Sequence, residues 1–276
     1  MADVYVTSWS EFVSAVAVSG DTVYLPENAE WDMEEILPWG TQSAITFACT
    51  EINGRGTTIK NLHLNQAITV SKNNIVIRNL IMKDWLCEGG TTTTEGSRSV
   101  FDANSSRNVY FYSCAFSGIL AAIKNRYVYG APHCHNCSLN IEASGTYFDI
   151  SNSGAGENRY CRIELHLPNN TNPVVATLDN EFCEIILYMP NATGGFYSCY
   201  YEGCTVRGNM QGITSDGSWG GDWTGFVSVY LDGIFGEGYS ARKKSGFVKC
   251  TQAQMKDPEY LRGKGFPIVT IEDGDT

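Results

Sequence analysis

The stretch Pro132–Cys137, read as PHCHNC, gathers residue types that bind metal ions. Cys134 and Cys137 have the CxxC spacing of many zinc sites, and two histidines lie beside them. The alternative is that a structural repeat, rather than a metal ion, places these residues. The pattern of the surrounding chain has to decide between the two interpretations.

A second set of candidate residues lies in GNMQGITSDGSWGGDWTG, where four side chains could contact a ligand or a partner: Asp216, Trp219, Asp222 and Trp223. The tryptophans could stack on a sugar ring, and Asp216 and Asp222 could form the acid and base pair of a glycosidase. Trp219 and Trp223 could equally pack on their own chain or against another protein, where tryptophan is enriched. All three interpretations stay open at this stage.

A repeat of a little over twenty residues explains the cysteines. Aligned segments place one apolar column at Leu62, Leu80, Cys114, Cys137, Cys161, Cys183 and Cys204, with spacings of 18, 34, 23, 24, 22 and 21 residues. The residue two places further on is always apolar, and the residue between is mostly polar or small. This alternation predicts short strands with one buried face. A second apolar column lies three places earlier, at Ile59, Ile77, Phe111 and Cys134.

Short strands separated by tight turns leave no room for helical crossovers, so the repeat predicts a solenoid whose coils add strands to parallel sheets. Cys134 and Cys137 then point inward. His133 is expected in an outward column with Thr58, Glu157 and Asp179, and His135 in one with Lys60, Arg78 and Arg159. Because the two residue types point to opposite sides of the wall, we expect no metal site and no cofactor.

The composition limits the partners. The chain has 19 Lys and Arg against 30 Asp and Glu, a net charge of −11, which disfavours nucleic acid and anionic membranes as partners. No run approaches the roughly 20 apolar residues of a membrane span. The first residues, MADVYVTSWSEF, lack the features of a secretory signal, so we expect the ten cysteines to be thiols made in a reducing compartment.

Three segments carry a resemblance to a known superfamily: a short helix followed by DTVYLP, the rung INGRGTTIKNL, and NNIVIRNL. Over about residues 1–235 the chain resembles the right-handed parallel β-helix, or pectate-lyase-like, superfamily, which implies an all-β fold with an N-terminal capping helix. Residues 236–276 are expected to form a C-terminal segment, with a helix over Thr251–Leu261 and a strand in FPIVTIE. This ending is similar to those of β-helix modules encoded by phages and prophages.

Catalytic members of that superfamily have recognisable charge clusters that this sequence lacks. The hydrolases carry adjacent aspartates, a Gly-His-Gly and an Arg-x-Lys, whereas this sequence has no Asp-Asp pair and no histidine flanked by glycine on both sides. The lyases stack calcium-binding carboxylates on successive coils. Here the corresponding outward positions pair Arg162 with Glu164 and Glu184 with Ile186, a mixture typical of a solvated face.

We therefore expect a non-enzymatic structural or adhesion protein, a virion component of a phage such as a capsid decoration, fibre or tail protein. Its expected partners are other virion proteins and further copies of itself, with a trimer favoured, and it would be made in the host cytoplasm. The alternative is a β-helix that binds or cleaves host surface glycans through the tryptophan loop. A third possibility is a bacterial surface module.

Overall fold

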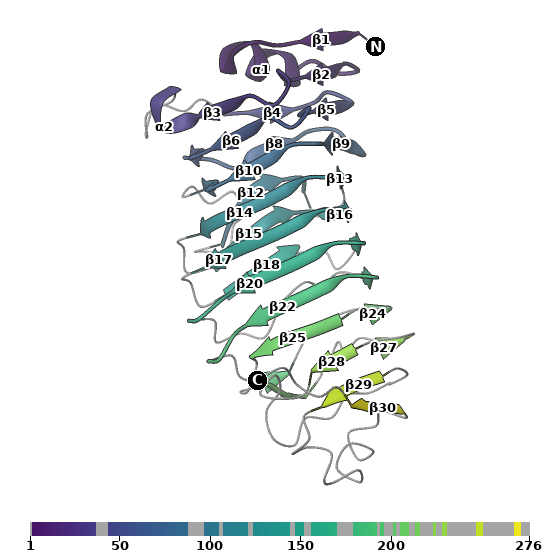
Figure 1. The fold of residues 1–276 in the computed structure, drawn as a ribbon. Helices are drawn as coiled ribbons and strands as arrows, with labels where there is room; N and C mark the ends of the chain where they lie inside the picture. The colour runs from purple at the N-terminus through teal and green to yellow at the C-terminus, as the bar shows by residue number, and fades with distance from the viewer. Residues whose placement is uncertain are drawn as a thin grey trace.

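The computed structural model describes the chain almost continuously through its first half and in shorter pieces towards its end. The described residues are 2–36, 44–87, 97–104, 107–120, 124–143, 147–151, 156–169, 179–191, 194–195, 201–202, 205–209, 213–215, 223–224, 228–230, 247–250 and 268–271. They form a parallel β-solenoid with two short helices, so the predicted all-β parallel fold is confirmed (Figure 1).

Two long sheets form two walls of the coil, and every strand pair recorded within them is parallel. The first sheet has ten described strands: β1 (Asp3–Tyr5), β2 (Thr22–Tyr24), β5 (Glu51–Asn53), β9 (Ile75–Arg78), β13 (Asn108–Tyr112), β16 (Ala131–His135), β19 (Glu157–Arg159), β21 (Asp179–Glu181), β24 (Tyr201–Glu202) and β27 (Trp223–Thr224). The second sheet has eleven: β3 (Glu30–Asp32), β6 (Thr58–Lys60), β10 (Ile81–Lys83), β14 (Ala115–Leu120), β17 (Ser138–Ala143), β20 (Arg162–His166), β22 (Glu184–Tyr188), β25 (Thr205–Asn209), β28 (Ser228–Tyr230), β29 (Phe247–Cys250) and β30 (Ile268–Ile271).

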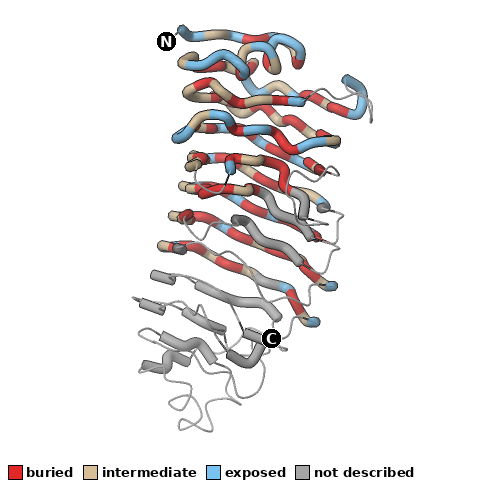
Figure 2. The backbone as a smooth tube through the Cα atoms, turned by 180° about the vertical axis from the view of Figure 1, so that it is seen from behind, coloured by how far each residue is buried: buried red, intermediate tan, exposed pale blue. Residues whose placement is uncertain are grey.

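A third sheet closes the coil. It contains β4 (Thr46–Phe47), β8 (Ile68–Val70), β12 (Ser97–Asp102), β15 (Lys124–Tyr129) and β18 (Tyr147–Ser151). Two further pairs are described, β7 (His63–Leu64) with β11 (Leu86–Cys87), and β23 (Gly194–Gly195) with β26 (Ile213–Ser215). Along the described strands buried and less buried residues alternate, which leaves one continuous apolar core inside the coil (Figure 2).

The turn from the first sheet to the second, here called the first corner, has a repeated backbone conformation. Its corner residue has a positive φ, between 52° and 82°, at Gly56, Asn79, Ser113, Asn136, Tyr160 and Phe182. A positive φ lets the chain turn sharply and is tolerated best by glycine and asparagine. The residue after it enters the core, and the second-sheet strand begins one residue later.

The structure corrects the predicted register of the first aligned repeat. Ile81 pairs with Thr58 and Met82 with Ile59, so Thr57, not Leu62, stands one coil before Leu80. Leu62 lies at a later corner, where β7 pairs with β11. Ile59 likewise belongs to the second sheet, and the partner of Ile77 in the inward column is Ile52.

The same correction moves Thr58 and Lys60 out of the histidine columns, because both lie in the second sheet. The error arose because both corners have a left-handed residue followed by a buried one, Gly56–Thr57 and Asn61–Leu62. The corrected spacing between Thr57 and Leu80 matches the later coils, unlike the short spacing of 18 residues that the alignment implied.

The N-terminal end is closed by α1 (Trp9–Val16), and α2 (Met33–Ile36) follows β3. Ser8 caps α1 by accepting a hydrogen bond from the Glu11 backbone N–H. Trp9, Phe12 and Val16 of α1 are buried. Phe12 contacts Phe47 edge to face, with a centroid distance of 6.1 Å, so α1 is anchored in an aromatic core.

The predicted C-terminal features are described only in part. β30 corresponds to the strand expected in FPIVTIE, and it pairs with β29. The helix expected over Thr251–Leu261 lies outside the described residues, as do most of the residues 236–276 assigned to a separate segment.

Candidate functional site

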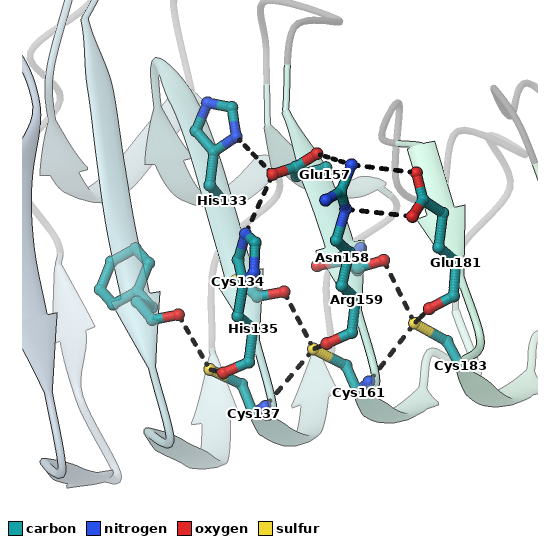
Figure 3. Close-up of polar contacts among 11 residues, drawn as sticks. His133, Cys134, His135, Cys137, Glu157, Asn158, Arg159, Cys161, Glu181 and Cys183 are labelled. Atoms are coloured by element: carbon teal, nitrogen blue, oxygen red, sulfur yellow. Dashed lines mark hydrogen bonds and ion pairs between the residues drawn. The ribbon is translucent and has the colours of Figure 1, made fainter.

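The cysteines of PHCHNC belong to a stack of thiols inside the first corner. This thiol ladder consists of Cys114, Cys137, Cys161 and Cys183, all buried, and it follows Leu80 in the same column. Each thiol donates to a backbone carbonyl of the preceding coil, at 3.2 to 3.4 Å. The Sγ atoms of Cys161 and Cys183 also accept hydrogen bonds from the backbone N–H of Cys137 and Cys161, both at 3.4 Å (Figure 3).

The environment of Cys114, Cys134 and Cys161 disfavours the nucleophilic thiolate form of these three side chains. Burial raises the pKa of Cys114 well above its usual value. Hydrogen bonds with neighbouring thiols, with burial as a further cause, raise the pKa of Cys134 and of Cys161. Since the thiolate is the reactive and metal-binding form, the ladder is a packing and hydrogen-bonding element.

The outer face of the same strands carries a row of polar side chains. The Glu157 carboxylate lies 2.9 Å from His135 Nε2, 3.4 Å from His133 Nδ1 and 3.1 Å from an Arg159 nitrogen. Arg159 also pairs with Glu181 at 3.1 Å. Figure 3 shows the histidines and these charged groups on one side of the wall and the thiols on the other.

This outer row explains why the histidines and cysteines do not form one site. His133 stacks on Tyr110 with a centroid distance of 4.5 Å, and His135 contacts Tyr112 at 5.0 Å. Among the described residues, no group of three or more His, Cys, Asp or Glu side chains is placed to hold a metal ion. Glu157 is shared between a cation and two imidazoles, so it serves as a bridge between coils.

The first corner itself exposes an aromatic pair. Tyr160 and Phe182 are 64% and 50% exposed, and their rings stack with a centroid distance of 5.4 Å and an interplanar angle of 10°. Both have a positive φ, 55° and 54°, although neither has the small or amide side chain that favours it. Nothing in the sequence analysis singled out these two residues as an exposed pair.

Ion pairs flank the corner aromatic pair on both walls. On the first sheet Arg159 pairs with Glu181, and on the second sheet Arg162 pairs with Glu184 at 2.6 Å. Further along the second sheet, hydrogen bonds from His166 and then from Arg162 lower the pKa of Glu164, against the opposing effect of burial. The surface therefore combines an apolar ridge with a rim of paired charges.

The inward column beside the ladder contains a feature that sequence reasoning missed. Asn158 and Asn180 are fully buried and stacked in register, and Asn158 Nδ2 donates to Asn180 Oδ1 at 2.9 Å. The signal in the sequence was an asparagine at the same position of two successive repeats, in a column that is apolar in the earlier coils. Amide groups can replace apolar ones there because neighbouring side chains hydrogen-bond to each other, although the buried Asn158 Oδ1 accepts no hydrogen bond from the described residues.

The residues predicted to contact a ligand are mostly beyond the described part. Asp216, Trp219, Asp222 and the ladder residue Cys204 lie outside the described residues, and Trp223 begins β27. Residues 88–96, in the long spacing between Leu80 and Cys114, also lie outside them. The predicted tryptophan loop thus stays a prediction.

Comparison with known proteins gave no match: no family model, no curated protein and no solved structure matches this chain. Neither described helix has the length and apolar character that crossing a membrane requires. The class that the geometry defines is a parallel β-solenoid whose described outer surface carries ion pairs between neighbouring coils.

Proposed function

We propose that this chain is a non-enzymatic structural or adhesion protein, a phage virion component that assembles with other virion proteins and with further copies of itself as a trimer. The observation that carries the proposal is the corner aromatic pair. Tyr160 and Phe182 are exposed on a rigid edge in a conformation that disfavours them.

The backbone conformation of Tyr160 and Phe182 costs free energy that ring stacking does not fully return. A non-glycine residue held in a sparsely populated backbone region costs about 1 to 3 kcal/mol. Stacking of two aromatic rings returns only about 0.5 to 1.5 kcal/mol. Asparagine, which stands at the same corner in Asn79 and Asn136, avoids most of that cost. Tyr160 and Phe182 therefore add nothing to the stability of the fold. We infer that they contact a partner, because aromatic residues dominate the binding energy of protein interfaces.

The charges around the pair support a binding surface over a catalytic one. Arg159, Glu181, Arg162 and Glu184 are held in ion pairs at the rim, which is the arrangement of many protein interfaces. The two rings also stack on each other, so the ring faces that they cover are not free to stack on a sugar ring. The virion assignment itself is supported by the resemblance of the C-terminal sequence to phage-encoded modules and by the acidic composition.

The test is the double variant Tyr160→Asn with Phe182→Asn. We expect a thermal unfolding midpoint equal to or above that of the unchanged chain, together with loss of the oligomer in light scattering. Incorporation into particles made from the encoding genome should fall at least tenfold. The control is Tyr188→Ser, which removes an exposed aromatic of β22 away from the corner.

Normal assembly and incorporation of the double variant would contradict the proposed contact. Depolymerisation of host glycans by the chain, lost in Asp216→Asn and Asp222→Asn, would replace the proposal with the enzymatic alternative. A monomer without affinity for any virion protein would count against the virion assignment as a whole.

A further inference from the structure

The N-terminal end of the first sheet has an open edge. β1 is the terminal strand in the order of the first sheet and is paired with β2 on one side only among the described strands (Figure 1). On that side the Ala2 carbonyl accepts from the Thr22 N–H, and the Val6 N–H donates to the Tyr24 carbonyl, both at 3.0 Å. In a parallel pair, residues in alternation bond to the same side, so the backbone groups of Asp3 and Tyr5 face outward.

A hollow lies directly beside this edge. It has a volume of about 480 Å³ between β1 and the outer side of α1, and its apolar wall comes from Val4, Val6, Ala15 and Val18. Val18 is 50% exposed. This space, the N-terminal hollow, is where the inward side chain of a further coil would stand.

The stacking already present shows how a further strand would register. Tyr5 of β1 stacks on Tyr24 of β2 with a centroid distance of 4.8 Å and an interplanar angle of 14°. Tyr5 is nevertheless 66% exposed. In a parallel solenoid, like positions stack on like positions. A strand added to β1 therefore places one side chain over Tyr5 and its preceding neighbour over Val4, in the hollow.

The charges at the edge select the occupant. Asp3 stands on β1, and Glu11 and Asp21 line the hollow. Glu11 accepts hydrogen bonds from Thr7, and Asp21 accepts one from the Ala2 N–H at 3.0 Å. None of the three carboxylates pairs with a described Lys, Arg or His side chain, so the edge keeps its negative charge and favours a cationic partner.

We propose that β1 and the N-terminal hollow bind an extended, basic segment of a partner protein by parallel strand addition. The segment places a Lys or Arg opposite Asp3, an aliphatic residue over Val4 in the hollow, and an Arg or aromatic residue on the open face of Tyr5. Main-chain hydrogen bonds to Asp3 and Tyr5 supply affinity, and the hollow supplies specificity. This inference does not depend on the proposed function, since it concerns a different surface.

The short length of β1 and the charge of Asp3 also have an alternative explanation. Short strands and charged side chains protect sheet edges from unwanted pairing. The two explanations predict different outcomes. A purely protective edge rejects every strand, whereas a recognition edge accepts a cationic one in a single register.

The experiment titrates the full chain with the peptide acetyl-TKVRT-amide at low salt and follows backbone amide shifts by NMR. We expect saturable shifts at Asp3, Val4, Tyr5 and Val18. A peptide with proline in place of the central valine should lose the binding at least tenfold, because the ring clashes and removes the N–H. Absence of saturable shifts up to millimolar peptide, or equal binding of the proline peptide, overturns the proposal.

Two chain variants locate the site. Ser14→Trp fills the hollow from an exposed position of α1, and Asp3→Lys reverses the charge at the edge. Each should weaken the peptide at least tenfold with an unchanged circular dichroism spectrum. The control Glu35→Lys makes the same charge change on α2 and should change the affinity less than twofold. Equal effects of Asp3→Lys and Glu35→Lys overturn the site. Self-association of the unchanged chain that Asp3→Lys abolishes would assign the edge to a second copy and overturn the partner.

Discussion

At the scale of single residues, the ladder cysteines satisfy backbone groups that the first corner brings together. The thiol of Cys161 donates to the Cys134 carbonyl at 3.2 Å and accepts from the Cys137 N–H at 3.4 Å. An aliphatic residue of similar size would fill the space but leave these groups unpaired, which is costly in a dry interior. Cysteine therefore recurs because it is small, apolar and able to bond in both directions.

A buried thiol makes the free energy of unfolding depend on pH, and Cys49 shows in which direction. Burial raises the pKa of Cys49 from 9.0 to about 12. Above pH 9 the unfolded chain loses this proton while the folded chain keeps it, so stability falls as the pH rises from 9 towards 12. At about 1.4 kcal/mol per pH unit, the contribution lost between pH 9 and pH 11 is about 2 to 3 kcal/mol.

The measurement is urea unfolding of the unchanged chain and of Cys49→Ala at pH 7, 9 and 11. Other groups titrate in this range, but they do so in both proteins. The difference between the two free energies of unfolding should therefore shrink by about 2 to 3 kcal/mol between pH 9 and pH 11. A constant difference across the three pH values would contradict the burial of a neutral thiol.

At the scale of elements, the strands and the inward columns were predictable because period-two alternation repeats in every coil. The cap helix was predictable too, from a Ser cap followed by Phe12 and Val16. The register of the first coil was not, because Gly56 and Asn61 mark two different corners with the same local signal. The strand β1 was not predictable either, because it has only three residues and is defined by its pairing with β2.

The candidate surface was harder to predict than the fold for a related reason. Tyr160 and Phe182 occupy a column where asparagine and serine stand in earlier coils, and single aromatic residues in a repeat usually indicate core. Their exposure follows from the left-handed corner, which turns the side chain outward. The buried asparagines Asn158 and Asn180 are the opposite case. They are polar residues at core positions, and they can lie there because their side chains hydrogen-bond to each other.

Gly54 tests the corrected register. A Cβ atom at Gly54 would lie 2.5 Å from the Asn79 carbonyl oxygen and 2.7 Å from the Leu80 Cα, so the backbone of the next coil would have to move. Gly54→Ala should cost about 1 to 3 kcal/mol, as overpacked substitutions do. The control is Gly20→Ala, which meets nothing within 4 Å but has a φ of +97° and carries a backbone penalty alone.

Chemical unfolding of the two variants checks this. Gly54→Ala should lose more stability than Gly20→Ala if the turn at residues 54–57 abuts the turn at residues 79–80. A smaller loss for Gly54→Ala would mean that the two turns are not adjacent, and Leu62 would again be a candidate for the place before Leu80.

At the scale of the whole molecule, the core changes character along the described coils. Near the N-terminus it contains linked aromatic rings, with Phe47 6.0 Å from Phe101 and Phe101 5.7 Å from Phe111. Further on, thiols and the Asn158–Asn180 stack take over the corner and its neighbouring column. Aromatic side chains bury more area than cysteine or asparagine, so the early coils are expected to be the more stable part.

In a solenoid each coil contacts only its neighbours, so local damage should stay local. Cys161→Asp places a carboxylate in the dry ladder between Cys137 and Cys183, and an unpaired buried charge costs several kcal/mol. We expect hydrogen exchange to lose protection in β16, β19 and β21 while β2, β5 and β9 stay protected. The control Arg162→Ala, one residue away on the outer face, should change protection little. Uniform loss of protection from β2 to β21 would show instead that the described coils fold as a single cooperative unit.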